Sequence, residues 1–537
     1  MLQSWLPDSM SQIMKGILLD YHFSYNNEMP FHPFLFAVYP VLYLVAHNIR
    51  TLRLADIWLP LGVVVIFTGL LFSGINLFIK NRSKASLIAS LLLVVFLNYG
   101  FVFDYLRSTS INNFIQGKQA PGYIAALLIT GFSSYLILKS KSGLTTLVTV
   151  SNRLSLVLVL IPIMQIAGFY YFHPQTVQQD FSLDYKNESS ESQVVNRDIY
   201  YFIFDRYGRE DVLKEAYDFD NSEFITYLTE KGFVIPARSW ANYTQTQLSL
   251  ASSLNMQYLD PIVEKQEEQS TDVRPLISLI EDNEVIRFLK KRGYTYIHAG
   301  SWWAITAYNR HADRNINLSS LSELSEVFFS RTIFHPLFVK FNIPVFNNRL
   351  TKWKRPLFKF EELSKIPGMG EPTFTFAHFL MTHEPYVFDA EGKFLSQEEI
   401  DSREASENYR AQLIFANKKI RELIDLLISA SGENRPIIII QGDEGPYPES
   451  YRTDAENFDW TKAGEDDIRH KMAIMNALYL PGIDDSEISD FITPVNTFRL
   501  VLNKYFGQEL PLLPNVSFLS NVNRPFKFLD MPRDPAK

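Results

Sequence analysis

Residues 199–205 have the sequence Ile-Tyr-Tyr-Phe-Ile-Phe-Asp, a short apolar run that ends at a carboxylate. The run is rich in β-branched and aromatic residues, and the helix-forming residues 211–218 follow it. An uninterrupted apolar strand that leads into a helix is typical of a parallel sheet buried on both faces. The stretch therefore predicts a central strand with Asp205 at its carboxyl end.

The same pattern recurs along the rest of the chain. Further short apolar runs occupy residues 294–297, 373–377, 437–440 and 477–480, and amphipathic segments such as 284–291 and 409–430 lie between them. Alternating strands and helices predict an α/β domain built on a doubly wound sheet. Ligands bind at the carboxyl ends of such strands, so the residues that follow each run are the first candidates for a site. These are Asp205, His298, the stretch from His378 to His383, Asp443 and Glu444.

The first 173 residues have a different composition. Of the 110 charged side chains in the chain, 16 lie in residues 1–173 and 94 in residues 174–537. Five stretches of the first region contain no charged residue: 29–49, 57–79, 85–103, 119–138 and 154–179. About 20 mostly apolar residues suffice to cross a bilayer. We therefore expect an α-helical transmembrane bundle of five spans in residues 1–173, a polar linker at 174–196 and the α/β domain at 197–537.

The charged residues between these stretches predict an orientation. With a cytoplasmic N-terminus, seven basic residues lie inside and four lie outside. The inner set is Lys15, Lys80, Arg82, Lys84, Lys139, Lys141 and Arg153, and the outer set is Arg50, Arg53, Arg107 and Lys118. Because basic residues are enriched in cytoplasmic loops, five spans then place the α/β domain outside the cytoplasm.

Charge and cysteine content exclude several classes of protein. The region after residue 173 carries a net charge of −14, which argues against a nucleic-acid binder, because phosphate backbones need a basic surface. The chain has no cysteine, so disulfides, thiolate metal sites and cysteine nucleophiles are excluded.

Three carboxylates and a threonine-rich turn suggest a metal-dependent site. Asp205, Asp443 and Glu444 are hard oxygen ligands at predicted strand ends, and a divalent cation would neutralise their mutual repulsion. The segment 241–253 is a hydroxyl-rich turn that opens a helix, where a threonine is either a nucleophile or an ordinary helix cap. Thr244 and Thr246 both fit either role.

The order of these motifs resembles a known group of proteins. Asp205 after a strand, the threonine-rich turn, the Thr-His-Glu-Pro-Tyr stretch at 382–386 and the Gly-Asp-Glu-Gly stretch at 442–445 resemble the sulfatase-like branch of the alkaline phosphatase superfamily. Five spans followed by one extracytoplasmic domain resemble lipoteichoic acid synthases and lipid A phosphoethanolamine transferases. The resemblance implies a sulfatase-like sheet flanked by helices and a multi-pass protein of the bacterial plasma (inner) membrane.

The resemblance also implies roles for single residues. The family's metal ligands fall on Asp205, Thr246, Asp443 and Glu444, and its threonine nucleophile falls on Thr246, with Thr244 as the alternative. The family usually has a histidine where Glu444 stands. A glutamate replaces a nitrogen ligand by hard oxygen, so we expect Mn, Mg or Ca rather than Zn.

Further residues resemble the family's substrate-binding elements. His383 matches a histidine that contacts the phosphate, and His298 and Arg310 resemble elements that bind a phosphoglycerol head group. Arg310 fits a phosphate oxygen or an ordinary surface position. His378 and His470 are expected to have structural roles. Trp302 and Trp303 either line the pocket or pack in the core.

The sequence thus leads to one main hypothesis with two alternatives. The main hypothesis is a phosphotransferase that moves a phospholipid head group, of phosphoglycerol or phosphoethanolamine type, onto a cell-envelope glycan or lipid through a phosphothreonine intermediate. The same residues would serve a phosphodiesterase that passes the group to water. A degenerate, non-catalytic binding protein is the other alternative, because Glu444 departs from the family pattern.

Overall fold

The chain forms two compact units in a computed structural model. The structure describes residues 29–531 apart from 110–117, 142–143, 173–180, 186–196, 265, 267, 319–320, 342, 344–346 and 456. The first unit comprises Met1–Tyr43, Pro60–Gln165 and Arg331–Ile333, and the second comprises Leu44–Leu59, Ile166–Ser330 and Phe334–Lys537. The predicted linker at 174–196 lies largely outside the described residues.

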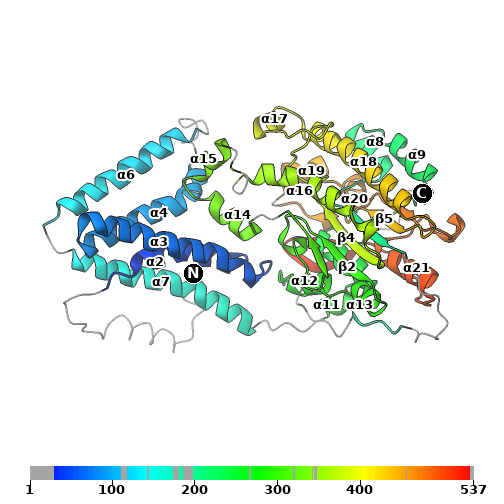
Figure 1. The fold of residues 1–537 in the computed structure, drawn as a ribbon, viewed down its shortest axis with the longest axis horizontal. Coiled ribbons are helices and arrows are strands. Elements are labelled where there is room, and N and C mark those ends of the chain that lie inside the picture. Colours follow the sequence, from blue (N-terminus) through cyan, green and yellow to red (C-terminus); the bar gives the residue numbers. More distant parts are fainter. Residues whose placement is uncertain are drawn as a thin grey trace. The chain divides into compact units, whose positions relative to one another are not determined.

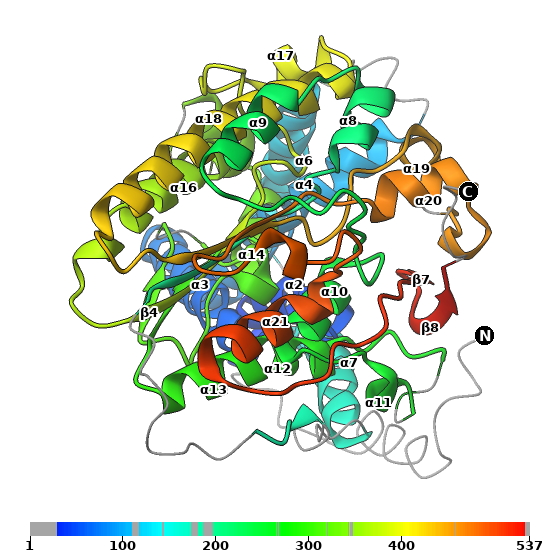
Figure 2. The ribbon, with the colours of Figure 1, turned by 90° about the vertical axis from the view of Figure 1, so that its right-hand side faces the viewer.

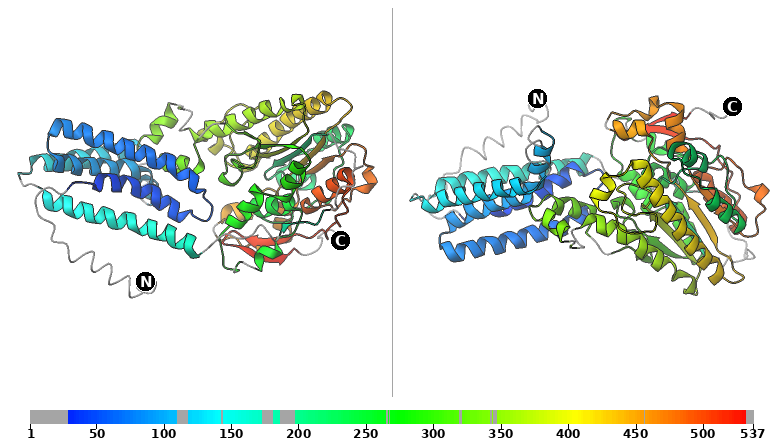
Figure 3. Two further views of the ribbon diagram at one scale, coloured as in Figure 1. Left: turned by 60° about the horizontal axis from the view of Figure 1, so that its bottom comes forward. Right: turned by 90° about the horizontal axis from the view of Figure 1, so that it is seen from above.

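The first unit is a bundle of apolar helices. Its helices are α2 (His32–His47), α3 (Trp58–Ile79), α4 (Arg82–Arg107), α6 (Ala120–Lys139) and α7 (Thr145–Phe172). Figures 1 and 3 show α3, α4 and α7 running lengthwise beside one another. Within the described residues, four helices are long and apolar enough to cross a membrane, counting η1 (Leu54–Ile57) together with α3. The structure thus confirms an N-terminal α-helical bundle followed by an α/β domain.

The predicted number of five spans is wrong by this measure. The first charge-free stretch forms α2, which has 16 residues. Such a helix is about 24 Å long, shorter than the hydrocarbon core of about 30 Å. The helix begins where the Asn152 side chain accepts hydrogen bonds from the backbone N–H groups of Phe31 and His32 at 3.2 and 3.0 Å. The prediction considered only charged residues. It therefore took no account of the polar residues His47 and Asn48 near the end of the stretch, where α2 ends.

A short segment from the second half of the chain belongs to the first unit. Arg331–Ile333 packs against α4, where the Gly100 N–H donates to the Arg331 carbonyl oxygen at 2.8 Å. A Cβ atom on Gly100 would lie 2.7 Å from the Arg331 Cα, so this approach requires glycine. An ion pair between Arg331 and Asp104 joins the same two elements.

The loop between α2 and α3 belongs to the second unit. It contains η1, which contacts α14 (Glu323–Ser330). The Arg53 guanidinium donates to the Ile305 carbonyl oxygen at 3.1 Å, and the Arg50 guanidinium donates to the Thr271 hydroxyl. Both arginines thus form hydrogen bonds within the second unit. They are two of the four basic residues that the sequence analysis places outside the cytoplasm.

The second unit is built on a six-stranded sheet with the order β3-β2-β4-β1-β5-β6. The strands are β1 (Ile199–Phe204), β2 (Thr295–Ala299), β3 (Arg314–Ile316), β4 (Thr373–Phe379), β5 (Ile437–Gln441) and β6 (Asn476–Tyr479). The first five strands are parallel to their neighbours, and β6 pairs antiparallel with β5. All five predicted strands are present. The prediction missed the short edge strand β3, and a two-stranded ribbon of β7 (Phe518–Asn521) and β8 (Arg524–Asp530).

Helices cover both faces of this sheet, as Figure 2 shows. Alternate residues of β1 point to opposite faces: Tyr201 and Ile203 pack with one set of helices, and Phe202 and Phe204 with the other. The first set is α10 (Thr246–Asn255), α12 (Arg274–Glu281), α13 (Glu284–Lys291) and α21 (Pro494–Phe506). The second set is α8 (Glu210–Tyr217), α9 (Ser222–Glu230), α16 (Asn348–Leu363) and α18 (Ala405–Ala430).

Shorter helices complete the unit. They are α11 (Asp260–Val263), α15 (His335–Lys340), α17 (Gln397–Asp401), α19 (Glu449–Thr453) and α20 (Glu465–Met472), with the 3₁₀ turns η3 (Ala304–Thr306), η4 (Ile366–Gly368), η5 (Trp460–Lys462) and η6 (Asp485–Glu487). The ribbon β7–β8 lies beside the start of α10, where Tyr243 bridges Phe518.

The four apolar helices between residues 54 and 172 predict on which side of the membrane each loop lies. Four crossings return the chain to the side on which the loop 44–59 lies, and that loop belongs to the same unit as the α/β domain. We expect a periplasm-active reporter fused after Lys537 to be active, and the same reporter inserted between α6 and α7 to be inactive. Enzymatic assay of the two fusions in intact cells checks this. Equal activity of both fusions would contradict the arrangement.

Candidate metal centre

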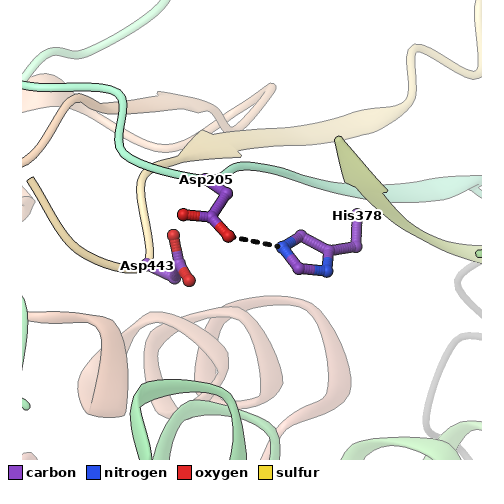
Figure 4. A group of neighbouring side chains, drawn as sticks. All are labelled: Asp205, His378 and Asp443. Atoms are coloured by element: carbon purple, nitrogen blue, oxygen red, sulfur yellow. Dashed lines mark ion pairs between the residues drawn. The ribbon is translucent and has the colours of Figure 1, made fainter. Parts of the chain in front are cut away.

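Three adjacent strands deliver three potential metal ligands to one edge of the sheet. Asp205 follows β1, His378 lies near the end of β4, and Asp443 follows β5. Figure 4 shows the three side chains pointing toward one another. The His378 Nε2 atom lies 3.6 Å from Asp205 Oδ2, and one ligand atom from each residue lies within 4.8 Å of the others. All three side chains are buried.

These ligand atoms lack other partners. In the described part of the chain, Asp205 Oδ1, His378 Nε2 and both carboxylate oxygens of Asp443 are buried without a hydrogen bond. Burial raises the pKa of the Asp443 carboxyl to about 7, and the charges of Asp205 and Glu444 add to the rise. Burial also raises the pKa of Asp205. Buried polar atoms without partners are costly, and a divalent cation would satisfy all of them. The residues therefore fit a metal ion.

The His378 ring is held in a suitable orientation. Its Nδ1 atom lies 2.8 Å from the Thr306 hydroxyl, which lies 2.8 Å from the Ser301 hydroxyl. Burial lowers the pKa of His378 to about 4, so the imidazole is neutral, the form that binds metals. An outer partner on one ring nitrogen that directs the other nitrogen to the ion is the usual arrangement of a metal-bound histidine. The sequence suggested a structural role for His378. Its position beside Asp205 and Asp443 makes it a candidate metal ligand as well.

Glu444 makes different contacts from those expected. Its Oε1 atom lies 2.6 Å from the Lys471 ammonium and 3.5 Å from Arg206 Nε. All three residues are buried. Glu444 is close enough to raise the pKa of Asp205 and Asp443, but the group of three converging ligands contains His378 in its place. A role for Glu444 as a metal ligand stays a prediction.

The two candidate threonines have different environments. Thr246 is the first residue of α10, is partly exposed, and lies close enough to Asp443 to lower the pKa of that carboxyl slightly. Thr244 is buried, and its hydroxyl donates to the Ser520 carbonyl oxygen at 2.8 Å and accepts from the Ser520 N–H at 3.2 Å. The Thr244 hydroxyl therefore joins the turn to β7, whereas Thr246 lies beside Asp443, one of the candidate metal ligands.

A cavity of about 610 Å³ opens beside these residues. Its lining includes Asp205, Thr246, His383 and Glu444. The His383 Nδ1–H donates to the Glu384 carbonyl oxygen, and burial holds the pKa of His383 well below its ordinary value. A neutral imidazole protonated on Nδ1 has its lone pair on Nε2, so His383 can accept a hydrogen bond there.

Two predicted substrate-binding residues lie elsewhere. Among the described residues that line the cavity, neither His298 nor Arg310 is present. Strand β2 extends to Ala299, two residues beyond the predicted end, so His298 lies inside the strand and its ring contacts the Tyr296 hydroxyl at 3.0 Å and the Thr306 carbonyl oxygen at 2.8 Å. Arg310 is 62% exposed and pairs with Glu281 at 3.3 Å.

Sequence reasoning missed Arg206. This residue directly follows Asp205, lines the cavity and has a φ of 62°, a strained value for a residue with a side chain. Its guanidinium lies 3.7 Å above the Tyr447 ring and 3.9 Å from Asp205 Oδ1. A planar cation beside a metal centre suits a phosphate oxygen. Its position directly after Asp205, at the end of the first predicted strand, was the signal in the sequence that could have identified it.

Several solved structures of other proteins are similar to this chain. No protein family model and no curated protein matches the chain. The chain is similar to the C-terminal periplasmic domain of EcEptC from Escherichia coli (13% identity, TM-score 0.41, 66% of this chain and 96% of that one). It is also similar to the lipoteichoic acid synthase LtaP from Listeria monocytogenes (12%, 0.37, 64% and 83%). A third similar structure is the integral membrane protein lipooligosaccharide phosphoethanolamine transferase A from Neisseria meningitidis (12%, 0.33, 87% and 93%).

Replacing single ligands distinguishes His378 from Glu444. We expect His378→Ala and Asp443→Asn to weaken metal binding by at least about 100-fold, because loss of an outer partner alone typically costs 10- to 100-fold. Glu444→Gln should change it by less than about tenfold. Metal content of the purified full-length variants, measured by elemental mass spectrometry, checks this. Loss of metal from Glu444→Gln with retention in His378→Ala would identify Glu444 as the ligand instead.

Proposed function

We propose that this protein is a membrane-bound, metal-dependent phosphotransferase that uses a phospholipid as donor. One observation carries the proposal: Thr246, at the start of α10, lines a cavity together with Asp205 and lies beside Asp443, and both carboxylates belong to the buried cluster that also contains His378. A hydroxyl beside a metal centre, with a guanidinium close by, is what nucleophilic attack on a phosphodiester requires. The apolar helices of the first unit supply attachment to the membrane.

Asp205, His378, Asp443 and Thr246 would hold the divalent cation. When bound, the ion stabilises negative charge on the threonine oxygen and on the phosphoryl group. The sequence analysis predicted Mn, Mg or Ca because all the ligand atoms that it named were oxygens. An imidazole nitrogen in the cluster removes that premise, because imidazole suits Zn, whereas the two carboxylates suit Mn. We therefore propose Zn or Mn.

Two bond exchanges describe the transfer. First, the Thr246 oxygen bonds to phosphorus, the bond from phosphorus to the diacylglycerol oxygen breaks, and the threonine proton ends on the released diacylglycerol. Second, the acceptor oxygen bonds to phosphorus, the phosphothreonine bond breaks, and the acceptor proton returns to Thr246. His383 lines the same cavity, and the Nε2 lone pair of its neutral ring can accept a hydrogen bond from the attacking hydroxyl.

Charged side chains around Thr246 would bind the phosphate. Arg206 lines the same cavity and supplies donors to the phosphoryl oxygens. Lys471, buried against Glu444, keeps that carboxylate neutralised so that it does not repel the phosphate. This pairing gives Glu444 a role that does not require it to bind the metal.

The acceptor is proposed to be a glycan or lipid of the cell envelope, with a phospholipid as the donor. A membrane-attached enzyme meets a lipid donor at high effective concentration. Transfer to water would make the protein a phosphodiesterase.

The covalent intermediate is directly testable. Incubation of the full-length protein with phospholipid micelles and no acceptor should leave a head-group phosphate adduct on Thr246, detected by mass spectrometry of the intact protein and its peptides. Thr246→Ala should abolish the adduct. Thr244→Ser, which keeps the hydroxyl, serves as the matched control and should retain it. Turnover without an adduct would indicate direct attack by water, and absence of both adduct and turnover would favour the non-catalytic alternative.

Arg206 has a separate prediction. We expect Arg206→Ala to lower kcat/KM for a phosphodiester by about 100- to 1,000-fold, the usual effect of removing one donor that stabilises transition-state charge. Metal content should remain unchanged, because Arg206 is not a ligand. Steady-state kinetics and elemental analysis of the same preparation check both parts. Unchanged kinetics in a folded Arg206→Ala protein would contradict the assignment.

A further inference from the structure

We propose that the loop 44–59 and the elements it contacts form a binding surface for the glycerol and proximal acyl groups of the donor lipid. This inference rests on the proposed function and names the part of the cavity that recognises a lipid. It also makes a loop between two helices of the N-terminal region a substrate-binding element of the α/β unit.

The lining of the cavity has two chemically different parts. The first part comes from the strand ends and the start of α10, and it is charged: Asp205, Arg206, Thr246, His383 and Glu444. The second part, which we call the apolar part, contains the apolar side chains of Leu44, Leu52, Val273, Trp303, Ile305, Leu324 and Val327. Polar lining residues lie among them, and these are His47, Asn48, Arg50, Thr51, Thr271 and Glu323, which suit the oxygen atoms of a glycerol and its esters. Trp302 lies where the two parts meet, because its ring is 6.0 Å from the His383 ring and it also lines the cavity.

The apolar part is held together by specific contacts. Arg53 donates to the carbonyl oxygen of Ile305, which is itself a lining residue, and Arg50 donates to the Thr271 hydroxyl. The turn η1 contacts α14, the helix that supplies Leu324 and Val327. The loop is thus fixed to the remainder of the second unit on two sides.

This division of the lining matches an amphipathic ligand. A small water-soluble diester would leave the apolar side chains exposed to water, whereas a lipid covers them and places its phosphate at the charged part. The volume of about 610 Å³ falls within the range of small-molecule sites, which suits a head group with its glycerol.

The kinetic test compares two substrates in the full-length protein. Leu52→Asp and Val327→Asp should raise the KM for phospholipid, presented in mixed micelles of phosphatidylethanolamine and phosphatidylglycerol, by about tenfold or more. The same variants should leave kcat/KM for bis(4-nitrophenyl) phosphate within about twofold. The matched control is Ile414→Asp on α18, an apolar residue that is 45% exposed and is not among the described lining residues. Equal losses on both substrates, or a phospholipid KM no different from that of the control, would overturn the inference.

A second readout does not depend on turnover. The Thr246→Ala protein is irradiated with a phospholipid that carries a photoactivatable diazirine next to its glycerol. Cross-links should appear in residues 302–305 and 324–327 and should disappear when Val327→Asp is added. Cross-links confined to α3, α4, α6 and α7 would overturn the inference. If the unaltered protein turns over no diester, the proposed function is refuted. The cross-linking experiment measures lipid binding without turnover, so its result would still support or overturn the lipid-binding surface.

Discussion

The mutual repulsion of Asp205 and Asp443 is the constraint on which the site depends. Both carboxylates are buried at the ends of adjacent strands, and each lacks a neutralising hydrogen bond on at least one oxygen among the described residues. Like charges at this spacing in a protein interior destabilise the fold unless positive charge is supplied. Arg206 and Lys471 supply some of it, and both also contact Glu444. A divalent cation would supply the remainder, and its binding would then be linked to the stability of this edge of the sheet.

Local sequence signals predicted much of the fold. The strand at 199–204 was predicted with its observed bounds, because a continuous apolar run that ends in a charge marks both limits of a buried strand. Asp205 and Asp443 could be predicted for the same reason. The number of spans could not be read from absence of charge alone, because α2 is apolar but shorter than the hydrocarbon core. The edge strand β3, with three residues, was too short for a periodic signal.

The remaining site residues depend on register and distant pairing. Extension of β2 by two residues turns His298 into the core, whereas the extension of β4 to Phe379 brings His378 to the metal ligands. His298 pairs with Phe376, which lies two residues before His378 on β4, so the two histidines share one face of the sheet and differ in how far along the strands they lie. An error of two residues in the end of β2 therefore made His298 look like a residue of the site. The pairing of Glu444 with Lys471 joins two different elements, and no local pattern encodes it.

The α/β unit is discontinuous in sequence, and this affects how such a protein can evolve. Arg50 and Thr271, which bond to each other, are separated by 221 positions in the chain. The chain that connects them includes the four apolar helices. An N-terminal bundle whose loop contributes to the α/β unit is not an interchangeable module. Recombination that exchanged the helices between relatives would also exchange one wall of the pocket, so anchor and domain are constrained to change together.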